Sequence, residues 1–148
     1  MQHFTKYLII GLVILLMSCA SGPKYSDINT MLPSMNPDEG RIYFYRTANP
    51  FGSGIQPDVK LNGEKVGDSK PGGFFFEDRR AGNYEVILST EVDKKLTFTL
   101  DRAATRYVRM SVGLGVIVYR VYPELVDEST AQSEMQGLSY TGTRLDKK

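Results

Sequence analysis

The chain has 148 residues, of which 41% are hydrophobic and 24% charged, as is typical of a folded globular domain. Lys and Arg number 18 against 17 Asp and Glu, so the net charge of +1 gives no indication of a nucleic-acid partner. One Cys and one His exclude a disulfide framework and a Cys/His zinc site. We therefore expect one domain that binds no metal, cofactor or nucleic acid.

Residues 1–18 have the pattern of a secretory signal peptide. Lys6 precedes an apolar run over residues 7–17, which as a helix would be about 16 Å long, against about 30 Å for a bilayer core. Small residues follow this run, as they do at signal cleavage sites. The sequence Leu-Met-Ser-Cys at 16–19 resembles the lipobox of bacterial lipoproteins, in which the Cys is lipidated and becomes the new N-terminus. A plain signal peptide with an incidental Cys19, or a single short anchor helix, is the alternative.

Lipidation of Cys19 would fix both the location and the chemistry of the mature protein. Two or more acyl chains hold a protein stably in a membrane. In the lipoproteins that this signal resembles, Asp after the Cys favours the inner membrane, so Ala20 implies an outer-membrane protein facing the periplasm. The mature chain would contain neither His nor a free thiol, which excludes a Ser-His-Asp triad. We expect no catalytic residues, and a carboxylate pair is the remaining enzymatic option.

The segment over residues 19–39 is rich in Ser, Pro, Asn, Gly and Asp, which is typical of a linker. As a flexible chain it would span about 25 Å r.m.s., enough to hold a domain just off a membrane surface. Three of its side chains are apolar enough to dock part of it onto the domain: Met31, Leu32 and Met35. The sequence leaves a free and a docked linker as alternatives.

Short runs of β-branched and aromatic residues begin at residue 40. Their spacing predicts an all-β domain over residues 40–136, a single small antiparallel β-sandwich of about seven or eight strands. Asn62-Gly63 lies between two such runs and predicts a tight hairpin turn, since both turn positions need a positive φ. One short C-terminal helix is expected over residues 127–135, followed by a flexible polar tail over residues 137–148. The expected strands are 41–46, 59–61, 65–67, 74–76, 84–89, 96–100, 107–112 and 116–122.

Six segments of this domain carry motifs whose order is informative: Gly40–Arg46, Val59–Gly67, Gly73–Phe75, Ala81–Val86, Tyr107–Arg109 and Pro123–Glu128. Their order resembles an uncharacterised domain family of proteobacterial lipoproteins. The succession of a strand, an Asn/Asp-Gly turn and a second strand is also similar to that of PEGA-type β-sandwich domains. The resemblance implies a lipid-anchored β-sandwich in the cell envelope. It implies no catalytic residue, because the family has no established activity.

Aromatic residues cluster in two runs, 43–45 and 74–76. If the second run is a strand, its middle ring points to the face opposite its two neighbours, and the two faces of an open sheet cannot both be core. Burial of that ring under the helix or the loops is the favoured interpretation. The alternative is that one aromatic ring lies on an exposed patch or beneath the linker. The candidate contacts to a partner protein or a glycan are Tyr43, Tyr45 and Phe75.

A mixed charge cluster, Glu77-Asp78-Arg79-Arg80, follows the second aromatic run. Four consecutive charged residues are typical of a solvated turn. A contact to the anionic head groups of a lipid surface is the alternative.

Together these features favour a non-enzymatic interaction or accessory module of the cell envelope. The expected partners are the membrane, through the N-terminal lipid, and an envelope protein. The aromatic residues also support an alternative, a module that binds glycan or peptidoglycan.

Overall fold

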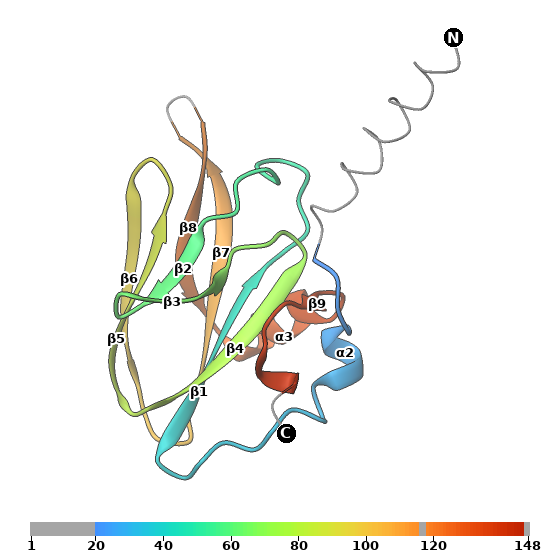
Figure 1. Ribbon diagram of the computed structural model, residues 1–148, viewed down its shortest axis with the longest axis vertical. Helices are drawn as coiled ribbons and strands as arrows, with labels where there is room; N and C mark the ends of the chain where they lie inside the picture. Colours follow the sequence, from blue (N-terminus) through green and yellow to red (C-terminus); the bar gives the residue numbers. More distant parts are fainter. Residues whose placement is uncertain (1–19, 116–117, 147–148) are drawn as a thin grey trace.

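The computed structural model describes residues 20–115 and 118–146, which form two β-sheets packed face to face (Figure 1). Sheet A has the strand order β8-β7-β1-β4-β9, and sheet B has the order β3-β2-β5-β6. The prediction of a small, mostly β fold is confirmed. The strands are β1 (Glu39–Arg46), β2 (Asp58–Leu61), β3 (Glu64–Asp68), β4 (Gly73–Arg80), β5 (Gly82–Ser89), β6 (Asp93–Leu100), β7 (Thr105–Leu114), β8 (Tyr119–Val126) and β9 (Ser139–Tyr140).

The described chain has nine strands rather than seven or eight, and the sheets are not purely antiparallel. β1 pairs with β7 in parallel, with Tyr43 opposite Tyr107, and β4 pairs with β9 in parallel. Between β1 and β7 the chain forms β2 and β3 in sheet B, β4 in sheet A, and then β5 and β6 in sheet B. β7 joins sheet A beside β1 and runs in the same direction as β1. β9 has only two residues, too few for an alternating pattern to predict it.

The β2–β3 hairpin has the predicted turn chemistry. Asn62 has φ 49° and Gly63 has φ 85°, which confirms the prediction that both residues adopt the left-handed region. Asn62 also joins the hairpin to β5: its side-chain oxygen accepts a 2.7 Å hydrogen bond from the Glu85 N–H. The turn therefore fixes both the register of β2 with β3 and the position of β5.

A close-packed interior lies between the two sheets. Phe44 of β1 stacks on Phe75 of β4, with 5.0 Å between ring centroids. Gly67 of β3 faces this pair, and a Cβ there would lie 2.6 Å from the Phe75 ring, so the close approach of the sheets requires glycine. The other fully buried side chains of this interior include Val59, Val86, Leu88, Leu100 and Val108.

Segments from both ends of the described chain cover the other face of sheet A (Figure 1). α2 (Tyr25–Ile28) comes from the expected linker, and α3 (Glu128–Met135) is the expected C-terminal helix. Tyr25 packs edge-on against two rings of sheet A, those of Phe74 at 5.3 Å and Tyr43 at 6.1 Å. None of the helices in the described ranges is long and apolar enough to cross a membrane.

The linker and the tail are both parts of this fold. Tyr25 and Ile28 are buried, whereas Met31, which the sequence offered for docking, is 69% exposed. Residues 138–140 are also buried, so the expectation of a loose tail is wrong for them, and the short 3-10 helix Arg144–Asp146 follows. The reason is that the second face of sheet A is rich in aromatic rings, and these segments remove that apolar surface from water.

Candidate functional site

The three aromatic residues proposed as surface contacts are all buried. Tyr43, Tyr45 and Phe75 expose 6%, 0% and 2% of their surface. The Tyr45 hydroxyl donates a 2.6 Å hydrogen bond to Glu134 of α3, and burial, followed by this bond, raises the pKa of Tyr45. The prediction that these side chains contact a partner or a glycan is therefore wrong. Within the run 74–76 it is Phe74 that packs beneath Tyr25 of the linker, which is one of the arrangements that the sequence offers, and the Tyr25 ring also covers Tyr43 of β1.

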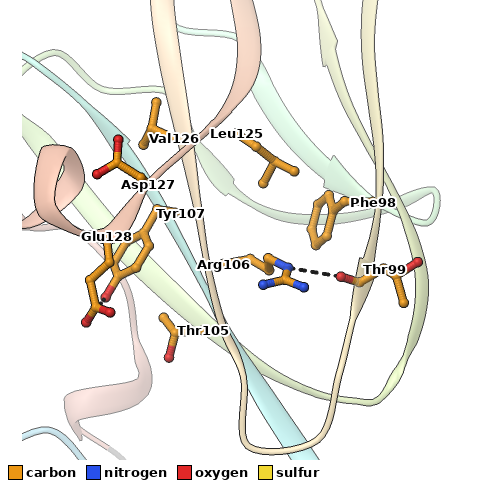
Figure 2. Close-up of a pocket in the computed structure, with 9 residues that line it drawn as sticks. All are labelled: Phe98, Thr99, Thr105, Arg106, Tyr107, Leu125, Val126, Asp127 and Glu128. Atoms are coloured by element: carbon orange, nitrogen blue, oxygen red, sulfur yellow. Dashed lines mark hydrogen bonds between the residues drawn. The ribbon is translucent and has the colours of Figure 1, made fainter.

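A hollow of about 530 Å³ opens at the side of the sandwich where β6 faces β7 and β8 (Figure 2). Its polar side chains are engaged in holding this edge together. Arg106 donates through Nε to the Thr99 carbonyl at 3.0 Å, and the Tyr107 hydroxyl donates to Glu128 at 3.3 Å. Asp127 accepts a 3.0 Å hydrogen bond from the first turn of α3. These roles are structural, and the geometry does not arrange the groups around a reacting centre.

The N-terminal segment enters the fold along the edge of sheet A. The Tyr25 N–H donates to the Leu138 carbonyl, and the Tyr140 N–H donates to the Pro23 carbonyl, both at 2.9 Å. A Cβ at Gly22 would collide with the carbonyl of Tyr140, so the segment can approach this edge only with glycine there. The segment therefore extends sheet A beyond β9 and is fixed by backbone hydrogen bonds.

Ala20 is the first described residue, and Cys19, the predicted lipidation site, lies outside the described residues. The Ala20 N–H donates to the Pro71 carbonyl at 3.4 Å. A groove of about 410 Å³ lies beside Ala20, between the N-terminal segment and the loop that follows β1. Its lining residues are Ala20, Lys24, Ala48, Asn49, Pro50, Ser53, Pro71, Gly72, Gly137, Leu138 and Ser139.

The loop over residues 47–57, which we call the Phe51 loop, is braced from inside the sandwich. Arg46 at the end of β1 is 1% exposed. Its guanidinium donates to the carbonyls of Ile55 at 2.6 Å, Gly52 at 2.7 Å and Ser69 at 3.0 Å. Burial lowers the pKa of Arg46. The buried guanidinium therefore ties two carbonyls of the loop to the end of β1.

The Phe51 loop presents an apolar side chain to solvent. Phe51 is 61% exposed, and its N–H donates to the Asn49 side chain at 2.9 Å. Its ring lies 6.0 Å from the ring of Tyr119 at the start of β8. Leu114, which pairs with Tyr119 across the β7–β8 hairpin, is 78% exposed. We call Phe51, Leu114 and Tyr119 the tip patch.

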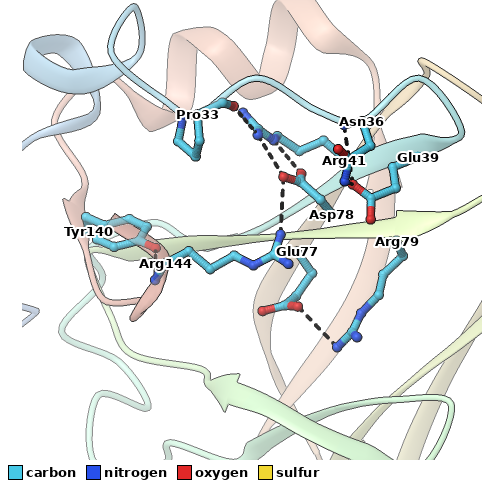
Figure 3. Close-up of polar contacts among 9 residues, drawn as sticks. All are labelled: Pro33, Asn36, Glu39, Arg41, Glu77, Asp78, Arg79, Tyr140 and Arg144. Atoms are coloured by element: carbon cyan, nitrogen blue, oxygen red, sulfur yellow. Dashed lines mark hydrogen bonds and ion pairs between the residues drawn. The ribbon is translucent and has the colours of Figure 1, made fainter. Parts of the chain in front are cut away.

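A buried charge network fixes the middle of the linker (Figure 3). Arg41 contacts Asp78 twice, from Nε at 2.7 Å and from a terminal nitrogen at 2.9 Å, and it donates to the Pro33 carbonyl at 2.6 Å. Arg144 lies 3.2 Å from the second oxygen of Asp78. The prediction of a solvated turn over residues 77–80 is therefore wrong, because β4 runs through these residues and Asp78 is 8% exposed.

Charge is distributed unevenly between the two ends of β1. At its start the Ala81 N–H donates to the Asp38 carbonyl and the Ala103 N–H donates to the Glu39 carbonyl, which brings three charged turns together. These turns carry Asp38, Glu39, Arg79, Arg80, Asp101 and Arg102. At its other end the described residues that line the groove include one charged side chain, Lys24, and no Asp or Glu. Lys70 adjoins the lining residue Pro71, and Asp58 and Asp68, which follow the Phe51 loop and precede Lys70, are both paired with Lys65.

Sequence reasoning missed this end of the molecule. Phe51 stands between Pro50 and Gly52, so it reads as part of an ordinary Pro/Gly loop. One signal was available: an aromatic residue in a loop of eleven residues, 47–57, without a charged side chain. The sequence does not show that Arg46 is buried and bonded to this loop, because an Arg at the end of a strand is expected to face solvent.

The fold and the site define a small two-sheet β domain with both of its terminal segments docked on one sheet. The chain belongs to the family described as "Protein of unknown function (DUF2846)", which matches residues 36–121. It is also similar to an uncharacterized protein of Haemophilus influenzae, with 26% identity over 143 residues that cover 93% of this chain and 84% of the relative. No solved structure matches the chain at a significant level. The expectation of a family without an established activity is confirmed.

Proposed function

We propose that this protein is a lipid-anchored lipoprotein of the cell envelope whose β domain is a non-enzymatic interaction module. The observation that carries the proposal is the position of Cys19, the only Cys of the chain. It stands after a short apolar run and immediately before Ala20, the first residue of the docked N-terminal segment. A lipid on Cys19 would therefore attach a folded domain to a membrane, and Ala20 favours the outer membrane, facing the periplasm.

An interaction role is supported by the ion pairs that charged side chains form within the fold. Arg109 bonds to Glu124 at 3.0 Å and to Glu134 at 2.7 Å, and Arg41 bonds to Asp78. These pairs hold strands and α3 together, so the carboxylates concerned serve packing. The buried positions of Tyr43, Tyr45 and Phe75 remove the residues that had motivated a glycan-binding alternative.

The outer face of sheet B is the surface that we propose for a protein partner. Terminal segments cover the outer face of sheet A, whereas Asn83, Thr97 and Thr99 of sheet B are exposed. A shallow hollow of about 440 Å³ lies on this side, lined by Asn62, Asn83, Tyr84, Glu85, Thr97, Phe98 and Thr99.

The lipid anchor is tested by growing cells with an alkyne fatty acid and comparing the wild type with Cys19→Ala and Ala20→Asp. We expect the wild type to be labelled and to fractionate with outer membranes, and Cys19→Ala to be unlabelled. Ala20→Asp should keep the label and move to the inner membrane. Equal labelling of the wild type and Cys19→Ala would refute the anchor.

The partner surface is tested by placing a photo-crosslinking amino acid at Thr97, with Thr143 on the terminal-segment side as the matched exposed control. We expect one defined protein adduct in intact cells from position 97 and none from position 143. An adduct with peptidoglycan alone would restore the glycan alternative. The same adducts from both positions would contradict a specific surface on sheet B.

A further inference from the structure

We infer that the groove end of the domain, with the tip patch, lies directly on the lipid bilayer that holds the N-terminal anchor. This inference rests on the proposed lipidation of Cys19. It goes beyond anchoring, because it assigns one end of the sandwich as a membrane-contacting surface and thereby fixes the orientation of the domain.

The first step is the length of chain between the lipid and the fold. A flexible linker of residues 19–39 would have allowed the domain to float about 25 Å from the membrane. The N-terminal segment is instead bonded to sheet A from Ala20 onwards, through the carbonyls of Pro71 and Leu138. Consecutive Cα atoms are about 3.8 Å apart. A lipid on Cys19 must therefore enter the bilayer within one residue of the groove.

The second step is the neighbourhood of that entry point. Ala20 lines the groove together with Asn49, Pro50 and Ser53, so the Phe51 loop lies beside the first described residue. Figure 1 shows this loop at the end of the molecule where the described chain begins and where the β7–β8 hairpin also projects. A bilayer that receives the acyl chains beside Ala20 therefore meets the Phe51 loop first.

The third step is the chemistry of this end. Lys24 is the one charged side chain among the described residues that line the groove, and Lys70 adjoins the lining residue Pro71. Asp58 and Asp68, which lie next in the chain to the segments that border the groove, are both paired with Lys65, so the groove itself presents positive charge to phosphate head groups. Phe51 is 61% exposed on a loop that Arg46 holds in place, and Leu114 is 78% exposed nearby. Aromatic and aliphatic side chains flanked by lysines are typical of proteins that bind at the membrane interface.

Single exposed apolar residues are common, and Met31 shows that exposure alone does not define a membrane contact. Met31 is 69% exposed, but it follows α2, which packs on the outer face of sheet A, and it is not among the residues that line the groove. Val92, also exposed, stands between Glu91 and Asp93 on the β5–β6 turn. Neither residue combines exposure with a position beside Ala20.

The chain contains no Trp, so one introduced Trp reports its own surroundings. We would purify the variants Phe51→Trp, Leu114→Trp and Met31→Trp from membranes, each in its mature form, and reconstitute them separately into vesicles. The vesicles would contain phosphatidylethanolamine and phosphatidylglycerol, with and without bromine on the acyl chains. We expect the emission of Phe51→Trp and Leu114→Trp to shift to shorter wavelength and to be quenched by brominated lipid. The emission of Met31→Trp should stay accessible to aqueous iodide.

The mass of each reconstituted variant separates the two proposals. If the protein carries lipid and floats with the vesicles, but brominated lipid quenches none of the variants more than Met31→Trp, the orientation is refuted and the anchor stands. If Cys19 carries no lipid, the anchor is refuted and the orientation falls with it. If the protein is lipidated and brominated lipid quenches Phe51→Trp and Leu114→Trp but not Met31→Trp, both the anchor and the orientation are supported.

Discussion

Arg41 and Asp78 lie directly opposite each other on the neighbouring strands β1 and β4, and their side chains form a two-point ion pair of 2.7 and 2.9 Å. Both side chains are 8% exposed. Because Arg41 also holds the Pro33 carbonyl and Asp78 also contacts Arg144, this pair joins the linker, sheet A and the C-terminal segment. The pair therefore ties the segments around Pro33 and Arg144 to the same face of sheet A.

Arg41→Met should destabilise the protein strongly. Removing one partner of a buried ion pair leaves the other charge uncompensated, which typically costs about 3–5 kcal/mol. Arg144 offsets part of this loss, since it remains 3.2 Å from Asp78. Urea unfolding measures the change, and the double variant Arg41→Met/Asp78→Leu should recover much of it. Equal stability of the wild type and Arg41→Met would contradict the role given to this pair.

Arg46→Met should free the Phe51 loop. The substitution removes the Arg46 donor from the carbonyls of Ile55, Ser69 and Gly52, and of these Gly52 keeps a 3.0 Å hydrogen bond from the Ile55 N–H. Each buried polar group that is left unpaired costs about 1–3 kcal/mol. Hydrogen exchange should show loss of protection in the loop, together with a lower free energy of unfolding. The matched control is Arg80→Met, whose side chain is 85% exposed and which should change stability by less than about 0.5 kcal/mol. Unchanged exchange in Arg46→Met would mean that the loop is not braced by this residue.

Tyr25→Ala should undock the N-terminal segment while leaving the two sheets folded. Tyr25 is 5% exposed and packs on Phe74 and Tyr43, and removing a buried aromatic ring costs about 3 kcal/mol or more. Limited proteolysis should then cut within residues 20–36 of the variant but not of the wild type. Met31→Ala, at an exposed position of the same segment, should not change the cleavage pattern. Cleavage of the wild type in this segment would restore the free linker.

Asp127→Ala should weaken α3 in a pH-dependent way. The Ser129 hydroxyl, followed by the N–H and hydroxyl of Thr130, holds the pKa of Asp127 far below its ordinary value of 3.8. A carboxylate with a depressed pKa stabilises the fold fully above its unfolded pKa and loses that contribution as the pH falls. Thermal unfolding should therefore show a lower Tm for Asp127→Ala at pH 7, with the difference shrinking below about pH 4. A difference that stays constant from pH 7 to pH 3 would contradict this role.

Short-range sequence patterns predicted the approximate positions of strands β1 to β8, the β2–β3 turn and the helix α3. The alternating runs located β1 to β8, the Asn62-Gly63 pair predicted the β2–β3 turn, and Asp127 with its acidic neighbour marked the start of α3. Each of these signals acts over a few residues, so it survives in any tertiary context. The boundaries were less certain, because β4 continues through the charged residues 77–80 that read as a turn.

The position of the candidate site depended on contacts between distant residues, which no local pattern contains. Strand alternation predicts that the aromatic run 74–76 is incompatible with an open, one-sided sheet, and the structure covers both of its faces. The sequence could not show that Tyr25 and Tyr140, from opposite ends of the described chain, cover it. For the same reason Tyr43 and Tyr45 looked available for binding, and the exposed ring of Phe51 was overlooked.

The central claim is that Cys19 carries the lipid that holds this domain at a membrane. The most direct measurement is the mass of the N-terminal peptide of the protein purified from the membranes of its native host. We predict a peptide that begins at Cys19 and carries a diacylglyceryl group and an amide-linked acyl chain. An N-terminus that retains residues 1–18, or an unmodified Cys19 in the membrane-bound protein, would contradict the account.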